Sequence, residues 1–282
     1  MDIPRRSRVY ESHFGLARRP FLESVDPAAY VPLPGHEALL RRLRYALEHS
    51  GGPAILHGPG GSGKTLLARR LASQLDAMGI HLPFPALPAA DLLDLLAEGL
   101  GMPPAPSSTP GESLRRVRTA LAALAFQNRR ALLIVDDAQT IRDPSTFDAL
   151  RLLLNFATDG PPDLMVLVVG TSELLEDVPP SLADRLTARC LAAPLTASES
   201  SQYIVDRLVA ASASASEAAR PPALFTPAAL ASLHYHAAGL PRRLNRLADL
   251  ALLVGYAQDL AIVDTPTIAI AARELDPDGL AA

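Results

Sequence analysis

Apolar positions in the middle of the chain predict short strands that alternate with longer helices. Runs such as 131–135 and 164–169 are continuously apolar, which indicates strands buried on both faces of a sheet. Elsewhere leucines recur at the three- and four-residue spacing of amphipathic helices. The expected strands are 53–57, 80–84, 131–135 and 164–169, and the expected helices are 36–48, 64–78, 91–99, 112–128 and 145–158. This order predicts an α/β fold with a parallel sheet sandwiched by helices.

Beyond residue 193 the pattern is helical only. Thr226 and Thr265 each precede a proline, the residue pair that favours the start of a helix. The expected helices are 198–210, 226–238, 241–257 and 265–274. We therefore predict an N-terminal arm and helix over 1–50, an α/β domain over 51–195 and a small helical domain over 196–282.

Composition narrows the class of protein. The 282 residues are 49% hydrophobic, which is ample for a packed core, and the lone Cys190 cannot form an internal disulfide. The apolar runs fall short of the roughly 18 residues of a membrane span, and the N-terminus lacks the apolar region of a signal peptide. We expect Cys190 to be an ordinary core residue, and the protein to be cytoplasmic with no direct membrane span. A net charge of -4 leaves nucleic-acid binding open.

A glycine-rich motif lies between the first expected strand and the following helix, where a P-loop belongs. It consists of Gly58, Pro59, Gly60, Gly61, Ser62, Gly63, Lys64 and Thr65. Such a loop turns its main-chain N–H groups toward phosphates, and Lys64, the only lysine of the chain, would reach the β- and γ-phosphates. The motif predicts binding of ATP, with Mg²⁺ held through the Thr65 hydroxyl; a chance glycine-rich turn is the alternative.

Two acidic residues follow the buried run 132–135. A P-loop needs a carboxylate at the end of a strand to hold the metal through water, and Asp136 fits that role. Asp137 stands where a general base could orient the attacking water. The alternative is a strand that ends in a surface turn.

Several segments together resemble a known family. They are 136–139 (DDAQ), 150–156 (LRLLLNF), 169–174 (VGTSEL), 239–245 (GLPRRLN) and the opening Tyr10, 13–16 (HFGL) and 20–21 (PF). These segments are similar to the ExeA/GspA-type ATPases, AAA+ proteins associated with general secretion pathways. The resemblance covers nearly the whole chain and implies a nucleotide-binding AAA+ domain followed by a helical lid domain.

The resemblance also assigns roles to single residues. It places Thr171 at the sensor-one position near the γ-phosphate, although a strand-end cap would look the same. Arg242 matches sensor two at the start of a lid helix, with Arg243 one residue away. His36 would border the adenine or simply pack.

Two arginines follow the strand 164–169 and precede a further, last strand of the domain. This is where the family places an arginine finger. Arg185 and Arg189 would act on the nucleotide of a neighbouring subunit, which implies a homo-oligomer. A solvated surface arginine is the alternative for both.

The sequence departs from the family at two places. The residue after the metal-binding aspartate is usually Glu, so the shorter Asp137 predicts slow hydrolysis, or a nucleotide-gated scaffold that barely turns over. Full-length relatives continue into a membrane span and a peptidoglycan-binding region, so we expect this chain to act through a separate partner.

Besides the nucleotide-gated scaffold, two functional hypotheses follow. The first is an oligomeric ATPase that drives assembly or remodelling of a partner complex in secretion. The second is a DNA-associated AAA+ regulator of the TniB/MuB type, which a cluster of arginines favours and interleaved acidic residues weaken. The cluster consists of Arg5, Arg6, Arg8, Arg18, Arg19, Arg41, Arg42 and Arg44.

Overall fold

A computed structural model describes residues 9–105, 109–154, 163–212 and 223–275 of the chain. Its contacts divide the chain into two compact units. One contains 25–30 and 35–193, and the other contains the described parts of 1–24, 31–34 and 194–282. Residues 1–50, expected to form an arm and a helix, are thus distributed over both units.

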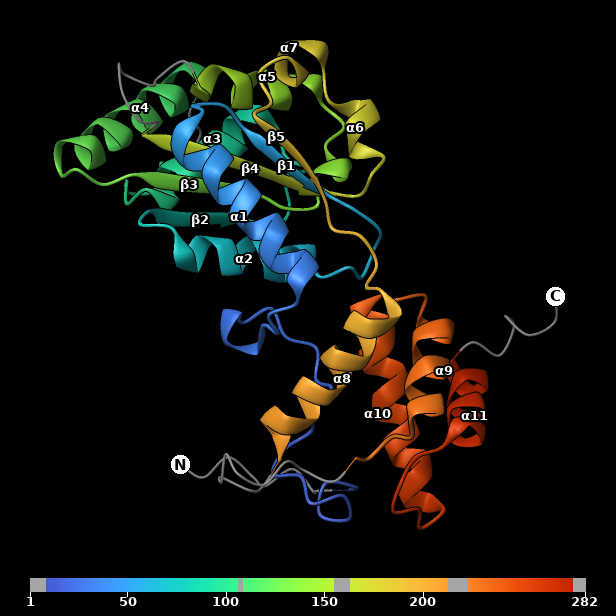
Figure 1. Cartoon of the computed structure of the whole chain (residues 1–282). Helices are drawn as coiled ribbons and strands as arrows, with labels where there is room; N and C mark the ends of the chain where they lie inside the picture. Colours follow the sequence, from blue (N-terminus) through green and yellow to red (C-terminus); the bar gives the residue numbers. More distant parts are fainter. Residues whose placement is uncertain (1–8, 106–108, 155–162, 213–222, 276–282) are drawn as a thin grey trace. The chain divides into compact units, whose positions relative to one another are not determined.

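The first of these units is built on a parallel sheet (Figure 1). Its strands lie in the order β2-β3-β4-β1-β5, and each pairs with its neighbours in parallel. The strands are β1 (Ala54–His57), β2 (Met78–Leu82), β3 (Ala131–Val135), β4 (Leu164–Gly170) and β5 (Ala188–Leu191). The predicted α/β fold class, with a parallel sheet between helices, is confirmed.

Helices connect the successive strands of this unit. Thr109 and Glu112 form a reciprocal capping box that starts one of them, and it satisfies two N–H groups that a helix end leaves unpaired. The helices are α1 (Pro34–His49), α2 (Lys64–Gln74), α3 (Ala89–Gly99), α4 (Pro110–Phe126), α5 (Pro144–Leu153), α6 (Leu174–Asp177) and α7 (Pro180–Ala183), and η1 (Pro27–Ala29) and η2 (Ala138–Thr140) are short 3₁₀ turns.

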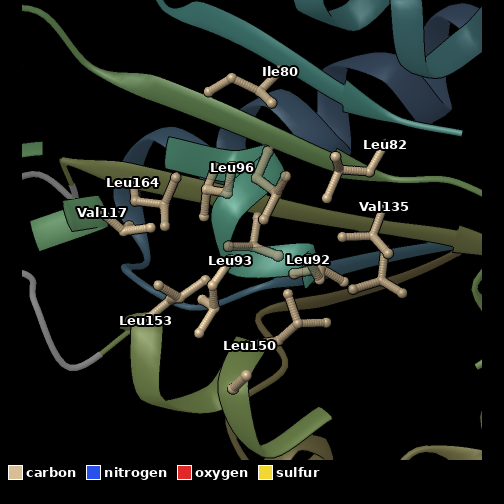
Figure 2. Close-up of a cluster of buried hydrophobic side chains, with 14 of the residues drawn as sticks. Ile80, Leu82, Leu92, Leu93, Leu96, Val117, Val135, Leu150, Leu153 and Leu164 are labelled. Atoms are coloured by element: carbon tan, nitrogen blue, oxygen red, sulfur yellow. The ribbon is translucent and has the colours of Figure 1, made fainter. Parts of the chain in front are cut away.

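Alternate residues of each strand face opposite sides of the sheet, and each side has its own core. Leu133 and Val135 of β3 belong to a cluster with leucines of α3 and α5 and with Val117 of α4. Figure 2 shows the side chain of Val135 together with labelled leucines of α3 and α5 in this cluster. Leu132 and Ile134 belong to a second cluster formed with α1 and α2. All four side chains are at most 2% exposed. The continuous apolar run of β3 therefore reflects burial on both faces.

The other unit is helical. It contains α8 (Ala197–Ala211), α9 (Pro227–Ala237), α10 (Pro241–Ala257) and α11 (Thr265–Leu275). Tyr10, Phe14 and Phe21 of the N-terminal arm are buried in its hydrophobic core. The Tyr10 hydroxyl donates to Asp249, which also pairs with Arg19. Burial, reinforced by the Asp249 carboxylate, raises the pKa of Tyr10.

Some predicted boundaries were wrong. The helix expected over 64–78 ends at Gln74, because β2 begins at Met78, which pairs with Ala131, and prolines follow the strand. Of the helix expected over 145–158, residues 155–158 lie outside the described part. Thr226 caps α9 as predicted, whereas Asp264 caps α11: its carboxylate accepts the Thr267 N–H at 3.1 Å.

Candidate nucleotide-binding site

The glycine-rich loop joins the carboxyl end of β1 to the first turn of α2. Gly58, Gly61 and Gly63 have φ of 153°, 80° and 88°. At Gly58 a side chain would collide with the main chain, since an added Cβ would lie 2.5 Å from the Ala192 carbonyl oxygen. At Gly63 there is space, but the left-handed conformation favours glycine. The loop is therefore shaped by backbone requirements that only these glycines meet at low cost.

Lys64 lies across this loop. Its ammonium group donates to the carbonyl oxygens of Gly58 at 3.0 Å and of Pro59 at 2.9 Å. Ser62 is fully buried, and its hydroxyl has no hydrogen-bond partner among the described residues. A buried hydroxyl in this position can be satisfied by a bound polar ligand. The loop thus combines the positive charge of Lys64 with a buried hydroxyl that has no partner among the described residues.

Asp136 is buried at the end of β3, with 4% of its surface exposed. Burial opposes its ionisation, but hydrogen bonds from His81, Thr65 and the Asp137 N–H outweigh burial, so the pKa of Asp136 is lowered. The His81 and Asp137 nitrogens lie 3.2 and 3.0 Å from its carboxylate oxygens. The carboxylate is therefore ionised and held in one orientation.

The tautomer of His81 follows from its other neighbour. A guanidinium can only donate, so the contact of Arg69 Nη2 with His81 Nδ1 at 3.2 Å makes Nδ1 an acceptor. The proton then lies on Nε2, which donates to Asp136. Arg69 and His81 were not predicted, because neither belongs to a motif and His81 lies 55 residues from its partner.

Asp137 is exposed just beyond β3. Its φ of 50° and ψ of 38° place it in the left-handed region, which aspartate tolerates better than most residues. Its carboxylate accepts a hydrogen bond from Gln139 Nε2 at 3.1 Å. The side chain predicted as a general base is therefore accessible to water and oriented by one neighbour.

Thr171 follows β4 directly and lies at the same edge of the sheet. Its N–H donates to Gln139 Oε1 at 3.1 Å, and its hydroxyl donates to Glu173 at 3.3 Å. Parallel pairing of His57 with Gly170 brings the end of β4 beside the start of the glycine-rich loop. The structure thus brings together the P-loop, Asp136, Asp137 and Thr171.

A histidine that the sequence analysis overlooked precedes the loop. His57 Nδ1 lies 3.2 Å from the Ser172 hydroxyl. Burial, together with the positive charge of Lys64, lowers the pKa of His57. A neutral imidazole next to Lys64 adds no competing charge to the loop.

His36 lies at the start of α1 in an aromatic and cationic setting. Its ring is 6.5 Å from that of Tyr30, and the Arg70 guanidinium lies over the Tyr30 ring at 5.4 Å. The Tyr30 hydroxyl donates to Glu37 at 2.8 Å. Tyr30 and Arg70 therefore tie the segment before α1 to the helix that follows the P-loop.

The predicted arginines occupy different settings. Arg185 is exposed after α7. Arg189 lies within β5 rather than before it, because it is in register with Ile55 of β1. The Arg189 side chain is exposed, and its guanidinium donates to the Ala183 carbonyl at 3.5 Å. Arg242 belongs to the helical unit, where it pairs with Glu23 at 3.5 Å.

The arginine cluster proposed for DNA is divided by the fold. Arg18 donates to the Ala210 carbonyl at 3.0 Å and Arg19 pairs with Asp249, so both hold the arm against the helical unit. Arg41, Arg42 and Arg44 are exposed on α1. Arg5, Arg6 and Arg8 lie outside the described residues.

Comparisons with known proteins agree with this arrangement. Residues 44–177 match the AAA domain family. The chain is also 31% identical over 273 residues to General secretion pathway protein A from Aeromonas hydrophila, covering 95% of this chain and 48% of that protein. The predicted resemblance to the GspA-type AAA+ ATPases is confirmed. The chain spans about half the length of this curated relative.

Solved structures share the fold at low sequence identity. Cdc6p from Pyrobaculum aerophilum has a TM-score of 0.69 at 18% identity and covers 90% of this chain and 70% of its own. The Aeropyrum pernix ORC1 protein, solved in complex with DNA, has a TM-score of 0.65 at 20% identity, covering 91% and 72%. The Thermotoga maritima RuvB branch migration motor has a TM-score of 0.57 at 19% identity, covering 92% and 74%. These likenesses show the shared fold, and the AAA domain match agrees with them.

No helix in the described part of the chain combines the length and the apolar character that crossing a bilayer requires.

The lowered pKa of Asp136 predicts a specific pH dependence of stability. A carboxylate with a depressed pKa in the folded state stabilises the protein above the unfolded value near 4, and this contribution is lost as pH falls through the folded pKa. Asp136→Asn should therefore reduce the fall in melting temperature between about pH 6 and pH 3. The exposed Asp76→Asn serves as the control. Equal acid sensitivity of wild type and Asp136→Asn would contradict the prediction.

Proposed function

We propose that this chain binds ATP with Mg²⁺ at the loop 58–65 and hydrolyses it slowly. The observation that carries the proposal is the meeting of two groups at one edge of the sheet. These are the Lys64 ammonium within its glycine loop and the hydrogen-bonded pair of Thr65 and ionised Asp136. A cation for phosphate and oxygen ligands for a hard metal are the two requirements of phosphoryl transfer.

The residues present fit a magnesium nucleotide. The Thr65 hydroxyl and the Asp136 carboxylate supply the oxygen donors that Mg²⁺ prefers, and Thr65 contributes to the lowered pKa of Asp136. Within the described part of the chain, no cluster of three or more His, Cys, Asp or Glu residues forms a self-sufficient metal site. A P-loop does not depend on such a cluster, because Thr65 and Asp136 would hold Mg²⁺ together with phosphates and water, and the metal would neutralise phosphate charge.

The remaining roles in binding and hydrolysis fall to side chains and N–H groups of this chain. Lys64 has to exchange its bonds to the Gly58 and Pro59 carbonyls for phosphate oxygens, and the loop N–H groups complete the cradle. Asp137, exposed and ordered by Gln139, would accept the proton of the attacking water. Thr171 would sense the γ-phosphate from the end of β4.

The assignments outside this centre belong to the same proposal. We infer that His36 borders the adenine, that Arg242 contacts the phosphates as sensor two, and that Arg185 or Arg189 acts on a neighbouring subunit's nucleotide. Arg185 and Arg189 are both exposed, as a finger that acts on another subunit must be. The resulting cytoplasmic homo-oligomer would drive assembly or remodelling of a secretion-related protein partner. Similarity to General secretion pathway protein A supports this role, whereas the division of the arginine cluster reduces support for DNA.

Removing the ammonium tests nucleotide binding. Lys64→Ala should weaken binding of magnesium ATP by about tenfold or more, because charge-assisted hydrogen bonds contribute roughly 1.5–3 kcal/mol. Isothermal titration calorimetry measures the affinity, and Arg129→Ala, at an exposed position beyond α4, is the matched loss of a cation. Unchanged affinity in Lys64→Ala would overturn the proposed site.

Replacing Asp137 by the longer glutamate tests whether the short side chain is the cause of slow hydrolysis. Asp137→Glu should raise the single-turnover rate, because a displacement of about 1 Å in a reacting group can change rates by about a hundredfold. Asp137→Asn should lower it, since the amide cannot accept the proton. Glutamate is less tolerant of the left-handed conformation, so the melting temperature of each variant has to be measured alongside. If a folded Asp137→Glu protein shows no gain in rate, the short side chain of Asp137 is not the cause of slow hydrolysis.

Mixed oligomers test the arginine finger. ATP should raise the mass measured by light scattering, and Arg185→Ala or Arg189→Ala should lower turnover while nucleotide affinity is kept. Mixing the inactive finger variant with Lys64→Ala should restore part of the activity, because the second subunit still supplies its arginine. A chain that is monomeric with and without ATP would refute action between subunits.

A further inference from the structure

We propose that Gln139 is a positioning residue that fixes the Asp137 carboxylate relative to the main chain at Thr171. This inference rests on the proposed function, because it concerns how that site orients its attacking water. Gln139 lies in η2, two residues after Asp137 in sequence and 32 residues before Thr171. It thereby links the segments that follow β3 and β4.

The two hydrogen bonds of Gln139 require an amide. Its Oε1 accepts the Thr171 N–H at 3.1 Å, while its Nε2 donates to Asp137 Oδ1 at 3.1 Å. A main-chain N–H can only donate and a carboxylate can only accept, so one orientation of the amide satisfies both partners. Glutamate would keep the first bond and lose the second, and leucine would lose both.

The neighbouring strand leaves room for this side chain. A Cβ added at Gly170 would lie 2.7 Å from Gln139 Oε1 and 2.9 Å from Leu174 Cδ2. Gly170 therefore permits the close approach, and its role here is steric. Gln139 itself is half-buried, next to the fully buried Ala138. The amide thus lies in a fitted space rather than on a freely exposed surface.

Asp137 needs such a partner. Its side chain is exposed, and apart from the Asp137–Gln139 bond its rotamer is little constrained by packing. Its backbone is fixed by the left-handed conformation and by the Thr140 hydroxyl, which donates to the Asp137 carbonyl at 2.8 Å. The Gln139 amide adds the last restraint, on the carboxylate. Because the planar Gln139 amide bonds to both groups, a displacement of the Thr171 main chain would also move the Asp137 carboxylate.

Two substitutions of Gln139 separate positioning from a structural role. Gln139→Leu and Gln139→Glu should both lower the single-turnover rate of ATP hydrolysis by about tenfold, with ATP affinity within about twofold of wild type. A purely structural role predicts a normal rate in Gln139→Glu, which keeps the bond to Thr171. The exposed Gln127→Leu at the end of α4 makes the same chemical change away from the site and should leave the rate unchanged.

A double-mutant cycle provides the second readout. If Gln139 acts through Asp137, Gln139→Leu should cause no further loss in an Asp137→Asn background. Independent, additive losses would overturn the proposal, as would wild-type rates in both Gln139 variants.

A steric variant keeps the test informative if the Gln139 variants fold poorly. Gly170→Ala displaces the amide without altering it, and should reproduce the loss in rate with ATP affinity kept. A normal rate there would refute the coupling. Wild-type protein that binds no ATP would instead refute the proposed function, and this inference with it; wild-type hydrolysis with unaffected Gln139 and Gly170 variants refutes this inference alone.

Discussion

Parallel pairing of β1, β3 and β4 is the constraint on which the candidate site depends. Because these strands run in one direction, their carboxyl ends meet at one edge, and the residues that follow them become neighbours. His57 pairs with Gly170 and Val135 with Val168, so the P-loop, Asp136 and Thr171 all leave the sheet at that edge. A slip of one residue would turn every side chain to the opposite face, and the two separate cores oppose such a slip.

At this edge of the sheet, hydrogen-bond donors rather than exposure to water keep the Asp136 carboxylate ionised. Asp136 is buried, yet the hydrogen bonds from His81, Thr65 and the following N–H favour its ionised form. The Arg69 guanidinium determines which nitrogen of His81 carries the proton. The His81 Nε2–H in turn orients the Asp136 carboxylate, whose negative charge is able to attract a cation.

Close approaches between loops depend on small residues at strand ends. At Gly58 any side chain would meet the main chain at Ala192, and at Gly170 it would meet the amide of Gln139. Asp137 adds a left-handed residue directly after β3, an arrangement that costs conformational energy and persists where the surroundings hold it. The strained turn and the tight contacts lie around the same edge, consistent with a fold that positions groups for chemistry there.

The sequence by itself determined the local features: the glycine loop, the buried strands, the helical C-terminal part and the burial of Cys190. These follow from hydrogen-bonding and burial rules that operate between near neighbours. It misplaced β2 by two residues and put Arg189 before β5, because strand limits depend on pairing with distant partners. Only the tertiary structure decided that His81 meets Asp136 and that Gln139 meets Thr171, since residues 55 and 32 apart are joined by strand order and packing that no local pattern encodes.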